Sequence, residues 1–266
     1  MDKIKFQKWQ GLGNDFIILE DKTATKELAI NMCDRKFGIG ADGLMSVKKS
    51  DNADIAWEFY NSDGTKPEMC GNGIRCFAKY VFEKGLINKK TFSVETLRGI
   101  TIPEILDDGK VKVDMNKPVF NPELIPINVK DPMDFEIEGY RASSVSMGNP
   151  HCLIFTDKDG KEPALKDGSK IENSILFPEK TNVEFINVIT RTKIKVNVWE
   201  RGCGITLACG TGACASVVAG IKKGLLDNKV EVLLPGGTLF IEYIEGNNVY
   251  MTGGAEKVFE GVYFDK

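Results

Sequence analysis

Several short segments of the chain alternate between apolar and polar residues, which is the pattern of strands with one buried face. Residues 55–60 place Ile55, Trp57 and Phe59 on one side, and residues 194–199 repeat the pattern. The other segments that predict strands are 92–96, 100–102, 230–234 and 239–243. Short strands therefore make up much of the predicted structure.

Three segments have the period of a helix instead. Apolar residues recur at positions 74, 77, 78, 81 and 82, which predicts a helix with one buried face that ends at Gly85, its C′ residue. Residues 213–221 are apolar on nearly every side, so we expect that helix to be buried more deeply. Residues 25–35 predict a third, amphipathic helix. Strands outnumber helices without a regular βαβ alternation, so the predicted fold class is α+β.

The sequence Cys-Gly-x-Gly occurs twice, at residues 70–73 and 209–212, an offset of 139. At the same offset, the Lys-Gly-Leu of residues 84–86 matches that of residues 223–225. Further matches at nearby offsets are residues 13–14 with 148–149, and Asp42 with Asn182. Single glycine matches mean little, but several in the same order near one offset indicate an internal duplication.

The period of this repeat is the size of a domain, far longer than that of a solenoid. We therefore predict two pseudo-symmetric halves of one topology, residues 1–115 and residues 116–255. Residues 256–266 form a short C-terminal tail, which we expect to pack on the first half.

Composition and charge restrict the partners. The net charge is −3 and no Lys/Arg-rich run occurs, so we expect neither nucleic acid nor acidic lipid to bind. No apolar run approaches the roughly 18 residues of a membrane span, and residues 1–5 do not begin a signal peptide. A cytoplasmic protein with a small-molecule substrate is the expectation.

The seven cysteines are an odd number for a protein of a reducing compartment, so a disulfide framework is not expected. Their closest spacings are Cys-x4-Cys and Cys-x5-Cys, whereas a zinc knuckle uses Cys-x2-Cys. His151 is the only histidine, which excludes a three-histidine metal site. The sequence also lacks a phosphate-binding context for pyridoxal phosphate and a dinucleotide motif. We expect no metal and no cofactor.

Each Cys-Gly-x-Gly segment lies between a predicted strand and a predicted helix. Unpaired N–H groups at a helix N-terminus bind anions, and the positive end of the helix lowers the pKa of a nearby thiol. A pseudo-two-fold axis would place Cys70 and Cys209 on opposite sides of one cleft. One thiolate could then remove a proton from a carbon next to a carboxylate while the opposite thiol returns a proton, which inverts the stereocentre.

Seven segments, taken together and in order, closely resemble the diaminopimelate epimerase family. The resemblance runs from about residue 4 to the C-terminus. The segments are residues 11–16 (Gly-Leu-Gly-Asn-Asp-Phe), 38–43 (Gly-Ile-Gly-Ala-Asp-Gly), 61–64 (Asn-Ser-Asp-Gly), 70–76 (Cys-Gly-Asn-Gly-Ile-Arg-Cys), 147–151 (Met-Gly-Asn-Pro-His), 200–202 (Glu-Arg-Gly) and 208–213 (Ala-Cys-Gly-Thr-Gly-Ala).

The resemblance implies an isomerase that interconverts L,L- and meso-diaminopimelate without pyridoxal phosphate or metal, for lysine and cell-wall peptide synthesis. It implies two halves, each a curled and mostly antiparallel sheet around a central helix, and a homodimer. It also implies that Cys70 and Cys209 are the acid/base pair, that His151 and Glu200 tune their protonation, and that backbone N–H groups hold the reacting carboxylate. The substrate-binding residues it implies are Asn14, Asn61, Gly71, Asn72, Asn149, Asn182, Glu200, Arg201, Gly210 and Thr211.

Three positions depart from the family pattern: Gln10 replaces a common His, Gly43 a frequent Gln, and Ile205 a usual acid. Other functions therefore stay open. They are a two-cysteine racemase of proline or hydroxyproline, a cofactor-free isomerase that moves a double bond, and a non-catalytic amino-acid-binding module. Which of the two cysteines is the thiolate at rest is also left open by the sequence.

Overall fold

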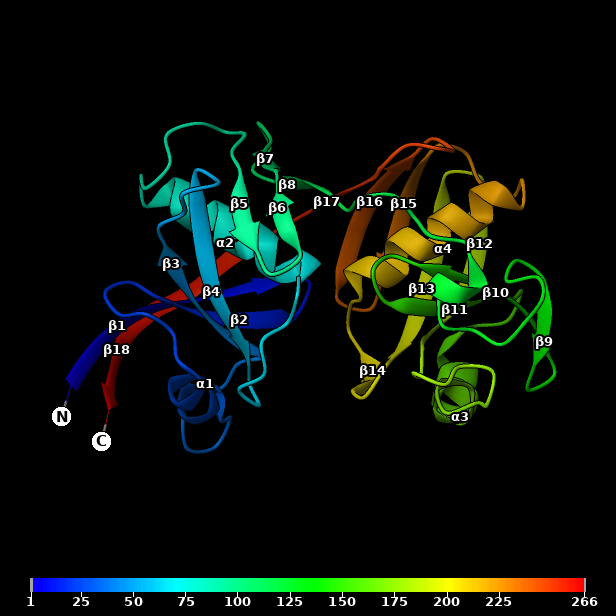
Figure 1. The fold of residues 1–266 in the computed structure, drawn as a ribbon, viewed down its shortest axis with the longest axis horizontal. Helices are drawn as coiled ribbons and strands as arrows, with labels where there is room; N and C mark the ends of the chain where they lie inside the picture. Colours follow the sequence, from blue (N-terminus) through cyan, green and yellow to red (C-terminus); the bar gives the residue numbers. More distant parts are fainter. Residues whose placement is uncertain (1, 266) are drawn as a thin grey trace. The chain divides into compact units, whose positions relative to one another are not determined.

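The computed structural model describes residues 2–265, which fall into two compact units. Of these residues, 2–113 and 253–265 form the first unit, and Asp114–Thr252 form the second. Figure 1 shows that each unit has its own sheet and its own central helix. Among the described residues, the helices are too short or too polar to cross a membrane.

The first unit is built on a sheet with the strand order β18-β1-β2-β3-β4-β5-β6. Helix α1 connects β2 to β3 and helix α2 connects β4 to β5, and both of these strand pairs are parallel. The remaining neighbours in this order are antiparallel. The elements are β1 (Asp2–Gly11), β2 (Asn14–Leu19), α1 (Lys26–Cys33), β3 (Gly43–Lys48), β4 (Ile55–Asn61), α2 (Gly71–Glu83), β5 (Val94–Thr96), β6 (Gly99–Thr101), the hairpin β7 (Pro103–Ile105) and β8 (Val111–Asp114), and β18 (Glu256–Asp265).

The sheet of the second unit has the order β17-β16-β15-β13-β12-β11-β10-β9, with β14 on β13. Helix α3 connects the parallel pair β11 and β12, and helix α4 connects the parallel pair β13 and β15. The elements are η1 (Pro122–Leu124), β9 (Phe135–Ile137), β10 (Tyr140–Ser146), β11 (Pro150–Phe155), α3 (Lys161–Glu172), β12 (Asn182–Thr190), β13 (Lys193–Glu200), β14 (Gly204–Thr206), α4 (Gly210–Lys222), β15 (Lys229–Leu234), β16 (Gly237–Tyr243) and β17 (Val249–Gly253).

The two units repeat one pairing scheme. The run from β1 to β6 is antiparallel, parallel, antiparallel, parallel, antiparallel, and the run β10-β11-β12-β13-β15-β16 has the same sequence of pairings. A parallel pair needs a long crossover, so a helix stands at each parallel step. The predicted α+β fold of two duplicated halves is confirmed.

The central helices end as the sequence predicts. Lys84 and Lys223 are the C-cap residues, and Gly85 and Gly224 follow with φ of +69° and +71°. A left-handed conformation at this position costs a residue with a Cβ about 1–2 kcal/mol, which explains the glycines. Between its ends, α4 is buried from Ala213 to Gly220, and the apolar face of α2 packs on β1, β2 and β7.

Two predicted boundaries need correction. The helix expected over residues 25–35 begins after its N-cap Thr25 and ends at Cys33. The Asp34 carboxylate accepts hydrogen bonds from the backbone N–H groups of Lys36 and Phe37, which turns the chain. The strand expected over residues 92–96 covers only Val94–Thr96.

Candidate active site

Both predicted catalytic cysteines occupy the N-cap position of a central crossover helix. Cys70 precedes α2 and Cys209 precedes α4, each in an extended conformation. The Cys70 sulfur accepts a hydrogen bond from the backbone N–H of Gly73 over 3.3 Å, and the Cys209 sulfur accepts one from Gly212 over 3.3 Å. The thiol group therefore serves as the cap side chain. The N–H groups earlier in each first turn have no intrahelical acceptor.

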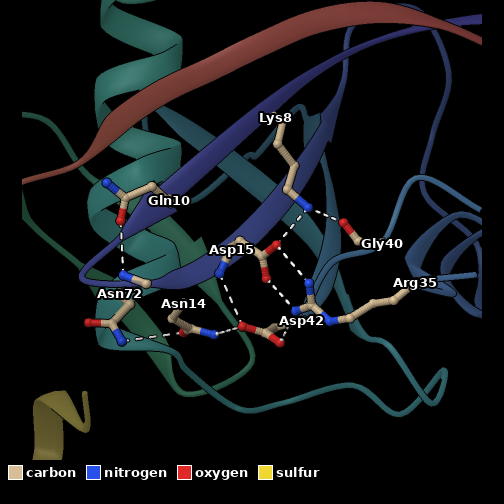
Figure 2. Close-up of polar contacts among 9 residues, drawn as sticks. Lys8, Gln10, Asn14, Asp15, Arg35, Gly40, Asp42 and Asn72 are labelled. Atoms are coloured by element: carbon tan, nitrogen blue, oxygen red, sulfur yellow. Dashed lines mark hydrogen bonds and ion pairs between the residues drawn. The ribbon is translucent and has the colours of Figure 1, made fainter. Parts of the chain in front are cut away.

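In the first unit, the amide of Asn14 lies between the Asn72 amide and the Asp42 carboxylate (Figure 2). Its Nδ2 donates to Asp42 Oδ2 over 2.6 Å. Its Oδ1 accepts from Asn72 Nδ2 at 3.3 Å and from the Cys70 thiol at 3.7 Å. The Asp42 carboxylate can only accept, so it fixes the orientation of the amide and turns the carbonyl oxygen toward Cys70. The structure thus brings Asn14, Cys70 and Asn72 together.

Asp42 is in turn held by a network of charged residues (Figure 2). Arg35 Nη2 lies 2.8 Å from Asp42 Oδ1 and 2.7 Å from Asp15 Oδ1, and the buried Lys8 lies 2.7 Å from Asp15 Oδ2. Lys8 also donates to the carbonyl of Gly40. Burial would raise the pKa of Asp15, but its contacts with Arg35 and Lys8 outweigh burial and lower that pKa to about 2.

The first turn of α2 rests on the fully buried guanidinium of Arg75. Arg75 donates to the carbonyl of Gly71, to Asn72 Oδ1 and to the carbonyl of Gly254. The Asn72 amide is therefore oriented at both ends. Asn61, at the end of β4, donates from its amide to Thr65 of its own turn.

In the second unit, Cys209 lies beside a buried His–Glu pair. His151 and Glu184 are both 0% exposed, and His151 Nδ1 lies 2.7 Å from Glu184 Oε1. The other ring nitrogen of His151, Nε2, lies 3.0 Å from Asn149 Oδ1. The Thr211 hydroxyl lies 3.4 Å from the Cys209 sulfur. Suitable side-chain atoms of His151, Glu184 and Cys209 all lie within 4.8 Å of one another.

The sequence predicts that the helix N-terminus lowers the pKa of each cysteine, and at Cys209 the Gly212 N–H does lower it, but other effects are larger. Burial raises the pKa of Cys209 well above its ordinary value, and the carboxylates of Glu200 and Glu184 raise it further. Hydrogen bonds from the Thr211 hydroxyl and from the Gly212 N–H lower the pKa of Cys209, but by less than burial and the two carboxylates raise it. The surroundings of Cys209 therefore favour its thiol form over the thiolate.

Four of the other cysteines are packed in the protein interior. Cys76 and Cys214 are buried inside α2 and α4, and Cys33 and Cys152 are buried in apolar segments. Burial raises the pKa of Cys33 and of Cys76 to about 12. Cys203, in contrast, is exposed.

The remaining predicted substrate ligands of this unit lie at the ends of β12 and β13. Asn182 is buried, and its amide donates to the carbonyl of Pro150 and accepts from the backbone N–H of Arg201. The Arg201 side chain is exposed and donates to the carbonyl of Glu179. Glu200 is half-buried, and its charge raises the pKa of both Cys209 and Glu184.

His151, Glu184 and Cys209 are the one group of described residues close enough to suggest a metal site. Ligand atoms on a tetrahedral zinc ion stand roughly 3.3 Å apart, given metal–ligand bonds of about 2.0 Å. The 2.7 Å between His151 Nδ1 and Glu184 Oε1 is shorter, because these atoms share a hydrogen bond. The arrangement fits a proton, not a metal ion.

Three residues that build the site have no role predicted from the sequence: Asp42, Arg75 and Glu184. Asp42 is there only a repeat match and a member of the segment 38–43, and Arg75 only a member of the segment 70–76. Glu184 had a readable signal, because it is the single acid of a mostly apolar strand and stands between Val183 and Phe185. A charged residue among the apolar neighbours of a strand is expected to be buried. Buried charges cluster at functional sites.

Comparison with known proteins identifies the family of the chain. The diaminopimelate epimerase family model matches residues 6–121 and 143–258, once in each half. The chain belongs to the diaminopimelate epimerase family. A diaminopimelate epimerase from Carboxydothermus hydrogenoformans is 48% identical, over 98% of this chain and 100% of its own length. The resemblance found in the sequence is confirmed, and with it the enzyme class, an isomerase.

Solved structures extend the likeness in fold to other activities. A PhzF-family phenazine biosynthesis protein from Bacillus anthracis has a TM-score of 0.70 and 17% identity, with both chains fully covered. A hydroxyproline epimerase from Agrobacterium vitis has a TM-score of 0.65 and 14% identity, covering 98% of this chain and 92% of its own. At these identities the likeness concerns the fold alone.

The charged network behind Asn14 predicts an acid-sensitive contribution to stability. With a folded pKa of about 2 against an ordinary 3.8, ionised Asp15 stabilises the folded state by about 2 kcal/mol at neutral pH. Because this pKa is lowered, the contribution is complete above about pH 5 and falls as pH drops, with about 1 kcal/mol lost by pH 3. Urea unfolding of wild type and Asp15→Asn should give a difference in stability that shrinks accordingly.

The exposed Asp51 offers the control. The difference between wild type and Asp51→Asn should stay near zero from pH 7 to pH 3. A difference for Asp15→Asn that did not change with pH would contradict the role assigned to the Lys8 and Arg35 contacts.

Proposed function

We propose that this protein inverts one α-carbon of diaminopimelate, from the L,L to the meso form, and so serves lysine and cell-wall peptide synthesis. The observation that carries the proposal is the placement of Cys70 and Cys209 at the same position of a duplicated fold, each capping a crossover helix. Relatives named diaminopimelate epimerase over the whole chain support the choice of substrate.

In the proposed reaction, one cysteine as thiolate removes the α-proton and the other as thiol delivers a proton to the opposite face. The two roles exchange when the reaction runs backward. Charge that develops next to the α-carbon moves into the substrate carboxylate, which the N–H groups of the two helix N-termini stabilise. We assign this role to the backbone of Gly71, Asn72, Gly210 and Thr211, which form the first turns after the two caps.

Recognition of the second amino-acid end of the substrate would use amides and one ion pair. We propose the amides of Asn14, Asn61, Asn72 and Asn149 and the side chains of Glu200 and Arg201 as its ligands. Arg201 suits a carboxylate because its exposed guanidinium keeps donors beyond the one used by Glu179. Asn182 would act differently: both ends of its buried amide hold backbone, so it positions Arg201.

The rival substrates are less well supported. A proline-type racemase and a double-bond isomerase share the fold at 12–14% identity, which says nothing of the substrate. A binding module without catalysis would not need a thiol at both equivalent caps. The amide-rich set and Arg201 favour a substrate with a second polar end.

We further propose that the reaction needs no cofactor and takes place in the cytoplasm. One thiolate removes a proton and one thiol delivers a proton, without an electron sink such as pyridoxal phosphate. Cys33, Cys76, Cys152 and Cys209 are free thiols, which suits a reducing compartment.

A homodimer is supported by the edge of the first sheet. Strand β18 ends the strand order, and it exposes four large apolar side chains. These are Val258, Phe259, Val262 and Phe264, each 45–56% exposed. An uncovered edge strand with exposed apolar residues promotes association, so we propose that a second copy of the chain covers it.

Sedimentation velocity tests this surface. Wild type should sediment as a dimer at micromolar concentration, and Val262→Lys with Phe264→Lys should sediment as a monomer. Ile189→Lys, which replaces an exposed apolar residue of β12, should stay dimeric. A monomeric wild type would refute the homodimer.

Replacement of either cysteine tests the reaction. With L,L-diaminopimelate as substrate and the meso product resolved by chromatography, Cys70→Ala and Cys209→Ala should each lower kcat by about 10²–10⁴-fold, because each removes one proton-transfer group. Cys203→Ala, at an exposed cysteine, is the matched control and should keep full activity. The wild-type rate should be unaffected by a chelator and by hydroxylamine. Near wild-type activity of Cys209→Ala would refute the opposed pair.

A further inference from the structure

The duplication allows the surroundings of the two cysteines to be compared position by position. Met45 pairs with Phe59 and Glu184 pairs with Val198 in equivalent strands, and both members of the second pair lie 139 residues after those of the first. A Cβ placed on Gly73 would lie 2.7 Å from Met45 Cε, and one placed on Gly212 would lie 2.4 Å from Glu184 Oε1. Met45 and Glu184 are thus the same position, pressed against the first turn of the central helix.

The neighbouring strand shows the same difference between the halves. Phe16 pairs with Gly43, and His151 pairs with Asn182, which again lies 139 residues after Gly43. An apolar pair, Phe16 and Met45, therefore stands in the first unit where His151 and Glu184 stand in the second. All four side chains are buried. The duplicated fold does not itself require an ionisable pair here.

Glu184 is not fully satisfied by hydrogen bonds. Its Oε1 bonds His151, but its Oε2 is buried and has no hydrogen-bond partner among the described residues. An unsatisfied buried carboxylate oxygen destabilises the fold, more strongly than a neutral group. Met45 shows that an apolar side chain fits the position. A role of Glu184 in the chemistry of the site explains why this destabilising carboxylate is present.

The protons on the His151–Glu184 pair decide whether the pair favours the thiol or the thiolate form of Cys209. Asn149 Oδ1 accepts from His151 Nε2, so Nε2 carries a hydrogen, and one proton remains between Nδ1 and Glu184 Oε1. Glu184 carries its negative charge when that proton lies on Nδ1, and its carboxylate then lies against the turn that begins at Cys209. The groups that face Cys209 are His151 from β11, Glu184 from β12, Glu200 from β13 and the Thr211 hydroxyl from α4.

Resting on the proposed function, we infer that Glu184 is a positioning residue that keeps Cys209 protonated in the free enzyme, so that Cys209 enters the reaction as the acid. The Cys209 S–H bond breaks as the new C–H bond forms, which leaves a thiolate on Cys209 and the substrate proton on Cys70. The charge of Glu184 does not change in this step. The raised pKa of Cys209, to which Glu184 contributes, agrees with the inference.

Alkylation rates measure the protonation of each cysteine directly. In a Cys203→Ala background, iodoacetamide labelling of Cys70 and Cys209 is followed by peptide mass spectrometry from pH 6 to pH 10. Each rate is normalised to its own plateau to remove differences in access. In the otherwise wild-type protein, the midpoint for Cys209 should lie above that for Cys70.

Two substitutions isolate Glu184: Glu184→Gln, which keeps the shape, and Glu184→Met, which installs the residue of the first half. In each, the midpoint for Cys209 should fall by about one pH unit, a tenfold gain in thiolate at a fixed lower pH, while the midpoint for Cys70 stays in place. The alkaline limb of the kcat/KM–pH profile should move down by the same amount. Asp167→Asn, a buried acid on α3 away from Cys209, should change neither.

Several outcomes would overturn the inference. A Cys209 midpoint at or below that of Cys70 does so without any variant of Glu184, even if both variants fail to fold. Unchanged Cys209 midpoints in folded Glu184→Gln and Glu184→Met do so as well. If the wild type labels as expected but does not epimerise diaminopimelate, the proposed function fails while the assignment of Glu184 stands.

Discussion

The unpaired N–H groups at the first turn of each central helix are the constraint from which the site follows. A parallel strand pair needs a crossover, and in each half the crossover is a helix whose N-terminus must be capped. Here the cap is a cysteine sulfur, 3.3 Å from the N–H three residues on. One element of the fold thus supplies a proton-transfer group and, beside it, donors for a carboxylate.

Duplication made two such sites, and the surroundings of the two then diverged. Cys70 donates to an Asn14 amide that Asp42 and Arg35 hold in place. Cys209 stands instead beside two acidic residues, Glu184 on β12 and Glu200 on β13. In equal surroundings the two cysteines would have the same pKa. Unequal surroundings give them different pKa values, so that one can be a thiol while the other is a thiolate. The asymmetry suits a reaction that needs one base and one acid.

Much of this arrangement could be predicted from the sequence, since its signals are local. The Cys-Gly-x-Gly repeats, the helix-ending Gly85 and the alternating strands depend on neighbours within a few residues. The pKa of Cys209 could not be predicted, because it depends on how deeply this residue is buried and on Glu184. Glu184 lies 25 residues earlier, on strand β12, whereas Cys209 caps helix α4. The same holds for Arg75, whose acceptors include Gly254 at the far end of the chain.

The fate of the α-hydrogen tests the two-cysteine reaction most directly. L,L-diaminopimelate is incubated with the enzyme in heavy water and sampled before the reverse reaction contributes. With separate groups for removal and delivery, the inverted carbon of the meso product should carry deuterium almost completely. The remaining L,L substrate should stay largely protiated, because the abstracting thiol returns the original hydrogen. Early product that retains mostly protium at the inverted carbon would contradict a reaction with one thiol on each face.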